Sequence, residues 1–120
     1  MMADLKKPDL NKGEVWIGVT TGKNGDVYHV ILLPGDNDDA TFADALAWAK
    51  GIGGDLPTRV EQSMLWATHR DQFQKSWYWS NETHHKYDDY AWSQGFVNGH
   101  QDDEPKPTKL RARAVRRVAI

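Results

Sequence analysis

Apolar residues recur at every second position near the start of the chain, a pattern that predicts β-strands. Within residues 14–21 the aliphatic side chains of Val15, Ile17 and Val19 alternate with other residues, as in a half-buried strand. A second run, 26–33, is rich in β-branched residues, and the Asn-Gly pair between the two runs is a turn signal. We therefore expect a β-hairpin, followed by an acidic loop at 36–39.

The period changes to that of a helix after Thr41, which we expect to be the N-cap residue. Four apolar residues then fall on one helical face: Phe42, Ala45, Leu46 and Ala49. A second helix is expected after Thr58, because Thr58 and Glu61 have the spacing of a capping box. Its inward face is expected to carry Val60, Met64 and Leu65.

The next apolar segment is an aromatic strand that starts at Trp77. Alternation places Trp77 and Trp79 on one face and Tyr78 and Ser80 on the other, so we expect Trp79 to be a core anchor under the two helices. A polar loop at 83–89 and a further strand at 90–96 follow. Residues 100–107 are charged and interrupted by proline, which predicts a loop, and 109–118 predict a closing strand with a bulge.

Composition fits one domain with a single modest core, since the chain has 120 residues, 39% of them hydrophobic. We expect an N-terminal arm at 1–13 and the domain at 14–120. The net charge of −2 disfavours a strongly basic nucleic-acid binder, and the absence of cysteine excludes disulfides and thiol chemistry. The first residues lack the apolar region of a signal peptide, and no apolar run could span a membrane. We expect a cytoplasmic or virion-associated protein.

Four motifs in this order resemble the Lcl C-terminal-like domain family of bacteria and phages, which is similar to the C-type lectin fold. They are Gly54-Asp-Leu-Pro-Thr58 with Glu61, Tyr78-Trp-Ser-Asn-Glu82, Ala91-Trp92 with Gly99, and Arg111-Ala-Arg-Ala-Val-Arg116. The resemblance covers about residues 14–118. It implies an α+β, C-type-lectin-like fold with an N-terminal β-hairpin, two helices and antiparallel strands with long loops. It implies no catalytic residues, and Ala114 stands where many members carry a cysteine.

Metal and catalytic chemistry find little support in the residue pattern. His84 and His85 with Asp88 and Asp89 carry ligand types that suit zinc, but neighbouring histidines point apart in an extended chain. The acidic residues at 36–39 and 101–104 lack the spacing of a calcium loop. The serines lack a nucleophile-elbow glycine frame, and capping explains Glu61. We therefore expect no metal, no cofactor and no enzymatic activity.

Basic residues gather in the closing strand and define an alternative surface. They could track phosphates if they shared one face, but alternation spreads them over two, and charge also protects an edge strand from aggregation. Nucleic acid is therefore a disfavoured partner. The alternative function is an intracellular inhibitor or regulator that binds a host protein or nucleic acid through this surface: Lys109, Arg111, Arg113, Arg116 and Arg117.

The remaining polar loops mix aromatic, amide and charged residues around the strand that contains Trp92, as binding surfaces do. Together with the family resemblance, this mixture leads us to interpret the chain as a non-enzymatic binding module, a phage or prophage accessory or receptor-binding protein. Its partner would be a protein or glycan on a host surface, or a host intracellular protein. The expected ligand-binding residues are His84, His85, Tyr87, Asp88, Tyr90, Trp92, Asn98, His100 and Asp102.

Overall fold

The computed structural model describes residues 6–120, so the first five residues of the expected arm lie outside it. Residues 6–13 form neither helix nor strand. The chain then forms β1 (Val15–Thr21), β2 (Val27–Leu32), β3 (Asn37–Ala40), α1 (Phe42–Gly51), α2 (Arg59–His69), the 3-10 helix η1 (Arg70–Gln72), β4 (Trp77–Thr83), β5 (Tyr90–Gly95), β6 (Gln101–Pro105), β7 (Leu110–Ala112) and β8 (Val115–Ala119).

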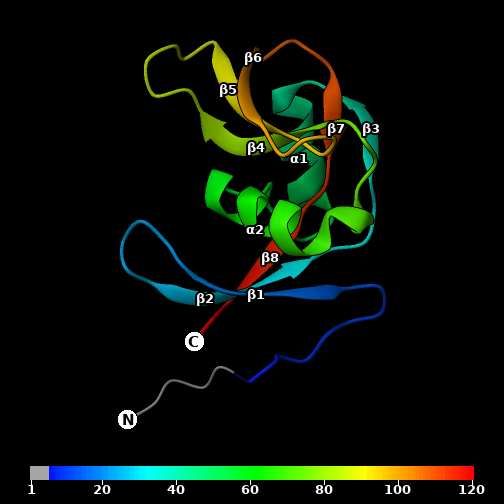
Figure 1. Ribbon diagram of the computed structural model, residues 1–120, viewed down its shortest axis with the longest axis vertical. Helices are drawn as coiled ribbons and strands as arrows, with labels where there is room; N and C mark the ends of the chain where they lie inside the picture. Colours follow the sequence, from blue (N-terminus) through cyan, green and yellow to red (C-terminus); the bar gives the residue numbers. More distant parts are fainter. Residues whose placement is uncertain (1–5) are drawn as a thin grey trace.

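The fold is α+β, with two helices and two sheets (Figure 1). The smaller sheet has the strand order β1-β2-β8 and the larger one β3-β7-β4-β5-β6. Neighbouring strands are antiparallel except β4 and β7, which pair in parallel. The predicted hairpin is confirmed as β1 and β2, whose turn is closed by a hydrogen bond from Gly25 N to Gly22 O.

Two segments of the chain connect the two sheets and run antiparallel to each other. One leads from β2 to β3 and the other from β7 to β8, and Leu33 N in the first donates a hydrogen bond to Ala114 O in the second. The prediction of one closing strand with a bulge was therefore wrong. Residues 110–119 are two strands that belong to different sheets, and Arg113 lies at the step between them.

Two segments expected to be loops are strands at the edges of the larger sheet. These are β3 in the acidic segment and β6 in the charged segment. Most of their residues are polar and exposed or half-buried, so neither has the apolar alternation by which strands are identified. Charged residues on an edge strand discourage pairing with another chain, which explains the composition.

Both helix starts follow the predicted capping chemistry. Thr41 Oγ1 accepts a hydrogen bond from Asp44 N, and Thr58 with Glu61 forms a reciprocal capping box. The inward face predicted for α2 was partly wrong, because Val60 is 57% exposed while Glu61, Gln62 and Leu65 are buried. Within the described residues, neither helix has the length and hydrophobicity needed to cross a membrane.

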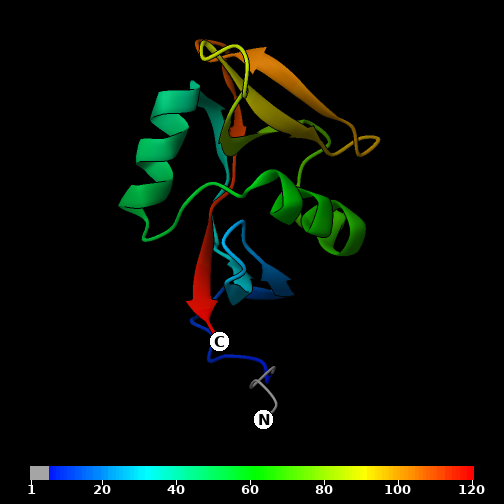
Figure 2. The same ribbon diagram turned by 90° about the vertical axis from the view of Figure 1, so that its left-hand side faces the viewer.

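The position of α2 between the two sheets explains why it buries polar side chains. It contacts β1 of the smaller sheet and β4 and β5 of the larger one, whereas α1 packs beside β3, β4 and β7 (Figure 2). A helix with neighbours on two sides buries more of its surface than a single apolar stripe covers. Polar residues such as Glu61 must then find partners inside the fold.

The strand β4 is buried on both faces, so two apolar clusters form instead of the single core that composition suggested. Trp79 is fully buried beside Phe42 of α1, with 5.4 Å between ring centroids, and its Nε1 donates to Ala40 O. Tyr78 faces the other cluster, where it contacts Phe73 and Phe96. Trp79 is therefore an anchor as expected, but its apolar cluster includes residues of α1 and none of α2.

The connection between the helices passes close to β8 at Gly54. A Cβ atom at this position would lie 2.6 Å from both Leu33 Cδ1 and Val115 O. Asp55 forms an antiparallel bridge with Val115, and Asp55 N donates to Val115 O at 2.9 Å. Glycine is therefore required for the chain to approach β8 and position the start of α2.

Candidate binding site

The first turn of α2 carries a buried ionic network on the side that faces the smaller sheet. Glu61 is fully buried, and its carboxylate accepts hydrogen bonds from Arg117 Nε at 2.7 Å and Arg117 Nη2 at 2.8 Å. Tyr28 Oη donates to the same carboxylate at 2.8 Å, and Arg117 Nη1 donates to Asp55 at 2.8 Å. The network thus joins α2 to β2 and β8.

Ionisation in this network is held in one state. Burial and the hydrogen bond to the Glu61 carboxylate raise the pKa of Tyr28 from 10.0 to about 12. Burial lowers the pKa of Arg117, but its hydrogen bonds to Glu61 and the charges of Glu61 and Asp55 outweigh that effect and raise it. The tyrosine stays neutral and the arginine charged near neutral pH, which suits a structural role.

The side of α2 that faces the larger sheet is built around Arg59, whose side chain is half-buried. Its guanidinium carbon lies 3.7 Å from the centroid of the Trp92 ring, and its Nε donates to Gln101 Oε1 at 2.9 Å. Gln101 is fixed in turn, because its Nε2 donates to Arg59 O at 2.8 Å and to Gln94 Oε1 at 3.0 Å. Arg59 is therefore oriented by a ring and an amide.

A row of stacked side chains extends from Arg59 onto the loop after β4. His84 stacks on Trp92 with 5.0 Å between ring centroids, and His85 stacks on His84 at 4.5 Å. Tyr87 packs beside His84 at 5.1 Å and is 50% exposed. We call His85, His84, Trp92 and Arg59 the aromatic stack, and it orders part of a loop that is otherwise polar.

The orientation of His84 follows from its hydrogen bonds. Its Nδ1 accepts from the backbone N–H groups of Lys86 at 3.1 Å and Tyr87 at 3.2 Å. A neutral His84 must then carry its proton on Nε2, which lies 3.6 Å from Asp103 Oδ2. The loop after β4 is thus held by hydrogen bonds from its own backbone to the His84 ring. The Asp103 side chain on β6 lies beside the aromatic stack.

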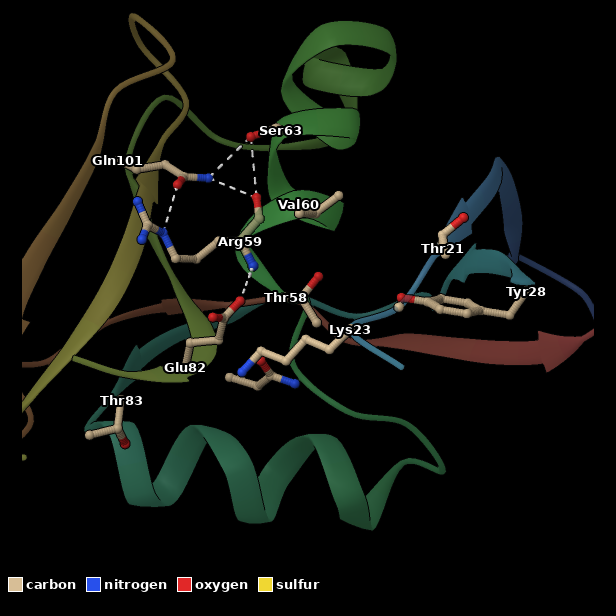
Figure 3. Close-up of a pocket in the computed structure, with 12 residues that line it drawn as sticks. Thr21, Lys23, Tyr28, Thr58, Arg59, Val60, Ser63, Glu82, Thr83 and Gln101 are labelled. Atoms are coloured by element: carbon tan, nitrogen blue, oxygen red, sulfur yellow. Dashed lines mark hydrogen bonds between the residues drawn. The ribbon is translucent and has the colours of Figure 1, made fainter. Parts of the chain in front are cut away.

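A cleft of about 780 Å³ opens beside the aromatic stack (Figure 3). Arg59 belongs to both, and its hydrogen-bond partner Gln101 also lines the cleft. The walls of the cleft come from the β1–β2 turn, the start of α2, the end of β4 and the start of β6. In the view of Figure 3, Glu82 lies between Arg59 and Lys23. Most of the residues that line the cleft are of polar types: Thr21, Gly22, Lys23, Tyr28, Thr58, Arg59, Val60, Ser63, Asn81, Glu82, Thr83 and Gln101.

The structure brings together only some of the expected ligand-binding residues. His84, His85, Tyr87, Tyr90 and Trp92 gather at one end of β5, where the Tyr87 and Tyr90 rings lie 6.3 Å apart. Asp88 is exposed in the same loop.

Three expected residues lie away from this group. Asn98 and His100 are exposed in the β5–β6 turn, and the strand pairing of β5 with β6 places that turn at the opposite end of the hairpin from Tyr90. Asp102 pairs with Ser93, so its side chain lies on the other face of the sheet from Trp92. Asp103, which pairs with Trp92, takes the place that was expected for Asp102.

The basic residues of the closing segment do not form one exposed surface. Lys109 is exposed and its Nζ lies 3.7 Å from Asp39 Oδ2. Arg113 is only 8% exposed and donates to the carbonyls of Gln72 and Leu33, and burial lowers its pKa. The other three are paired with carboxylates: Arg111 with Asp36, Arg116 with Glu14, and Arg117 with Asp55 and Glu61.

The acidic segments considered as metal ligands are also dispersed. Asp36 accepts from Tyr78 Oη at 2.6 Å as well as from Arg111. Burial and this bond to Asp36 raise the pKa of Tyr78. No group of three or more His, Asp or Glu side chains within residues 6–120 is arranged to hold a metal ion. The cleft and the aromatic stack offer hydrogen bonds, charge and stacking to a ligand.

Arg59, Lys23, Gln101 and Asp103 could not be identified as site residues from the sequence. Arg59 and Gln101 are 42 residues apart, and their contact depends on how α2 packs against an edge strand that carries no apolar signal. The capping box was the one sequence signal for Arg59, because the residue after the N-cap Thr58 lies at the exposed end of its helix. No protein-family model matches this sequence, and no curated protein sequence matches it either.

Proposed function

We propose that the protein is a non-enzymatic binding module of C-type-lectin-like fold, related to the Lcl C-terminal-like domain family. In this proposal it serves a phage or prophage as an accessory or receptor-binding protein. Its partner is a protein or glycan on a host surface. The observation that carries the proposal is the aromatic stack, which holds polar and aromatic groups in fixed positions beside an open cleft.

Preorganised side chains favour binding because little conformational entropy is lost when a ligand arrives. Tyr87, at 50% exposure, and the exposed His85 supply contact area, while Arg59 and Asp103 supply opposite charges nearby. Aromatic and arginine side chains of this kind are enriched among residues that dominate binding energy.

Two further observations support parts of the proposal. Residues of the family-like motifs have structural roles, namely Gly54 at its close approach, Thr58 and Glu61 in the capping box, and Trp79 in a core. The hydroxyls of Ser63, Ser80 and Ser93 donate to main-chain carbonyls, which favours a module without a serine nucleophile.

Binding to envelope extracts of candidate host bacteria, measured by biolayer interferometry, tests this function. We expect the wild type to bind and Tyr87→Ala with His85→Ala to weaken binding about tenfold, because both side chains lie at the exposed end of the site. His100→Ala is the matched control at the opposite end of the β5–β6 hairpin. A larger loss with His100→Ala would contradict the location of the site, and no binding to any extract would contradict the function.

A further inference from the structure

Arg59 has hydrogen-bond donors that the fold leaves unused. Its Nε is bonded to Gln101 and its plane is fixed over Trp92. Within residues 6–120, neither of its Nη groups has a hydrogen-bond or ion-pair partner. A guanidinium held by one edge and one face presents its remaining edge as a planar fork, the geometry that binds a carboxylate through two parallel bonds.

Three arginines on strands of the two sheets contrast with Arg59, which belongs to α2 and has no ion pair among the described residues. Arg111, Arg116 and Arg117 each lie on a carboxylate of the same chain at 3.0 Å or less. Lys23 also lacks a partner among the described residues, and it lines the same cleft as Arg59. The cleft therefore holds two unpaired cations.

One carboxylate, Glu82, lies between these cations in the view of Figure 3. Its Oε2 accepts the backbone N–H of Arg59 at 2.7 Å, so it caps α2 and forms no ion pair with either cation. The positive end of the helix dipole offsets part of its charge. The cleft is consequently net positive, and an acidic ligand complements it.

We infer that the cleft binds an acidic peptide segment of a partner protein, with an Asp or Glu carboxylate on the free edge of Arg59 and Lys23 as a second contact. This inference rests on the proposed binding function and names its ligand class. Val60 favours a peptide over a saccharide, because its aliphatic side chain is 57% exposed at the cleft and suits an apolar neighbour of the acidic residue. Among residues 6–120, the Thr21 and Thr83 hydroxyls and Asn81 Oδ1 have no hydrogen-bond partner, so they can bond peptide amide groups.

A bead library of random octapeptides screened with the full chain tests the inference. Selected peptides are resynthesised and their dissociation constants are measured by fluorescence anisotropy. We expect enrichment of Asp or Glu beside an aliphatic residue. Arg59→Met should weaken binding about tenfold and Lys23→Ala about threefold, and added salt should weaken it further. Arg59→Lys should not restore affinity, since lysine lacks the planar fork.

Matched controls separate the cleft from general positive charge. Arg70→Met removes an arginine that also stacks on a tryptophan, Trp66 at 4.2 Å, but lies outside the cleft. Lys75→Ala removes an exposed lysine elsewhere. Both should leave affinity unchanged, whereas Glu82→Gln should strengthen binding because it removes the one opposing charge while its amide oxygen still caps α2.

Several outcomes would overturn the inference. These are selected peptides without acidic enrichment, equal affinity of Arg59→Met and wild type, or binding of polygalacturonate through Arg59 without binding of any peptide. The proposed function is tested separately, by the binding of the protein to envelope extracts. If wild type and Arg59→Met bind an extract equally, the ligand class alone is wrong. If the wild type binds neither extracts nor peptides, both proposals fail.

Discussion

The Arg117 side chain, which reaches the start of α2 from β8, and the Arg59 side chain, which belongs to α2, lie on opposite sides of that helix start. They differ in how completely their hydrogen-bond donors are used. Arg117 bonds to Glu61 through two nitrogens, to Asp55, and through Nη2 to Leu56 O at 3.1 Å. Arg59 bonds through one nitrogen and stacks on Trp92. The first arginine completes a buried network, and the second is oriented with its donors still open.

This difference separates groups that hold the fold from groups that can bind a ligand. A buried carboxylate such as Glu61 requires its partners, because an unpaired buried charge costs several kcal/mol (about 3–5). A half-exposed guanidinium can remain partly hydrated until a ligand replaces water. Saturated polar groups in this protein therefore indicate structure, and oriented but unsaturated ones indicate a site.

Replacement of Arg117 should have the largest effect on stability. We expect Arg117→Met to lower the free energy of unfolding by about 3–5 kcal/mol, because it leaves the fully buried Glu61 without its cation. Urea denaturation followed by tryptophan fluorescence measures the change. Adding Glu61→Gln to that variant should recover part of the loss, and Arg70→Met serves as the control. A loss below about 1 kcal/mol would show that the network does not hold the sheets together.

The sequence predicts those parts of the fold that depend on local residue patterns. Hairpin, helix starts and aromatic strand follow from local patterns, such as the Asn-Gly turn and the spacing of Thr58 with Glu61. The strands β3 and β6 were missed because they are polar edge strands. The change of sheet at Arg113 was mistaken for a bulge, since apolar alternation is interrupted in both cases.

The candidate site was predictable only where its residues are close in the chain. His84, His85 and Tyr87 were found because they share one polar loop after an aromatic strand. Arg59 and Asp103 reach the site from α2 and β6, and the register that pairs Trp92 with Asp103 is set by the tertiary fold. The basic residues looked like a surface because their carboxylate partners, such as Glu14 for Arg116, are distant in sequence.

A moderate and pH-dependent effect is expected at Glu14, another carboxylate that is paired with an arginine, Arg116. The hydrogen bond from Arg116 chiefly lowers its pKa from 4.5 to about 2. The stabilisation is therefore present above about pH 4.5 and is lost as the pH falls toward 2. Because Arg116 is partly exposed, we expect only about 1 kcal/mol.

Urea denaturation midpoints measured at about pH 6 and about pH 2.5 test the contribution of Glu14 to stability. Most of the pH-dependent loss falls between these two values. Glu14→Gln should lose stability at the higher pH and depend less on pH than the wild type. Asp26→Asn, at an exposed residue of the β1–β2 turn, is the control and should keep the wild-type dependence. An unchanged pH dependence in Glu14→Gln would assign the acid sensitivity to other carboxylates.

The smallest stability effect is expected at Arg59, although its effect on binding should be large. Arg59→Met keeps an unbranched side chain over Trp92 and leaves the backbone N–H that Glu82 accepts, so only the cation–π contact and the bond to Gln101 are lost. We expect the free energy of unfolding to fall by about 0.5 kcal/mol. Urea denaturation of this variant beside Arg117→Met measures the difference. If both variants lost the same stability, Arg59 would be a structural residue like Arg117, and its open donors would no longer indicate a site.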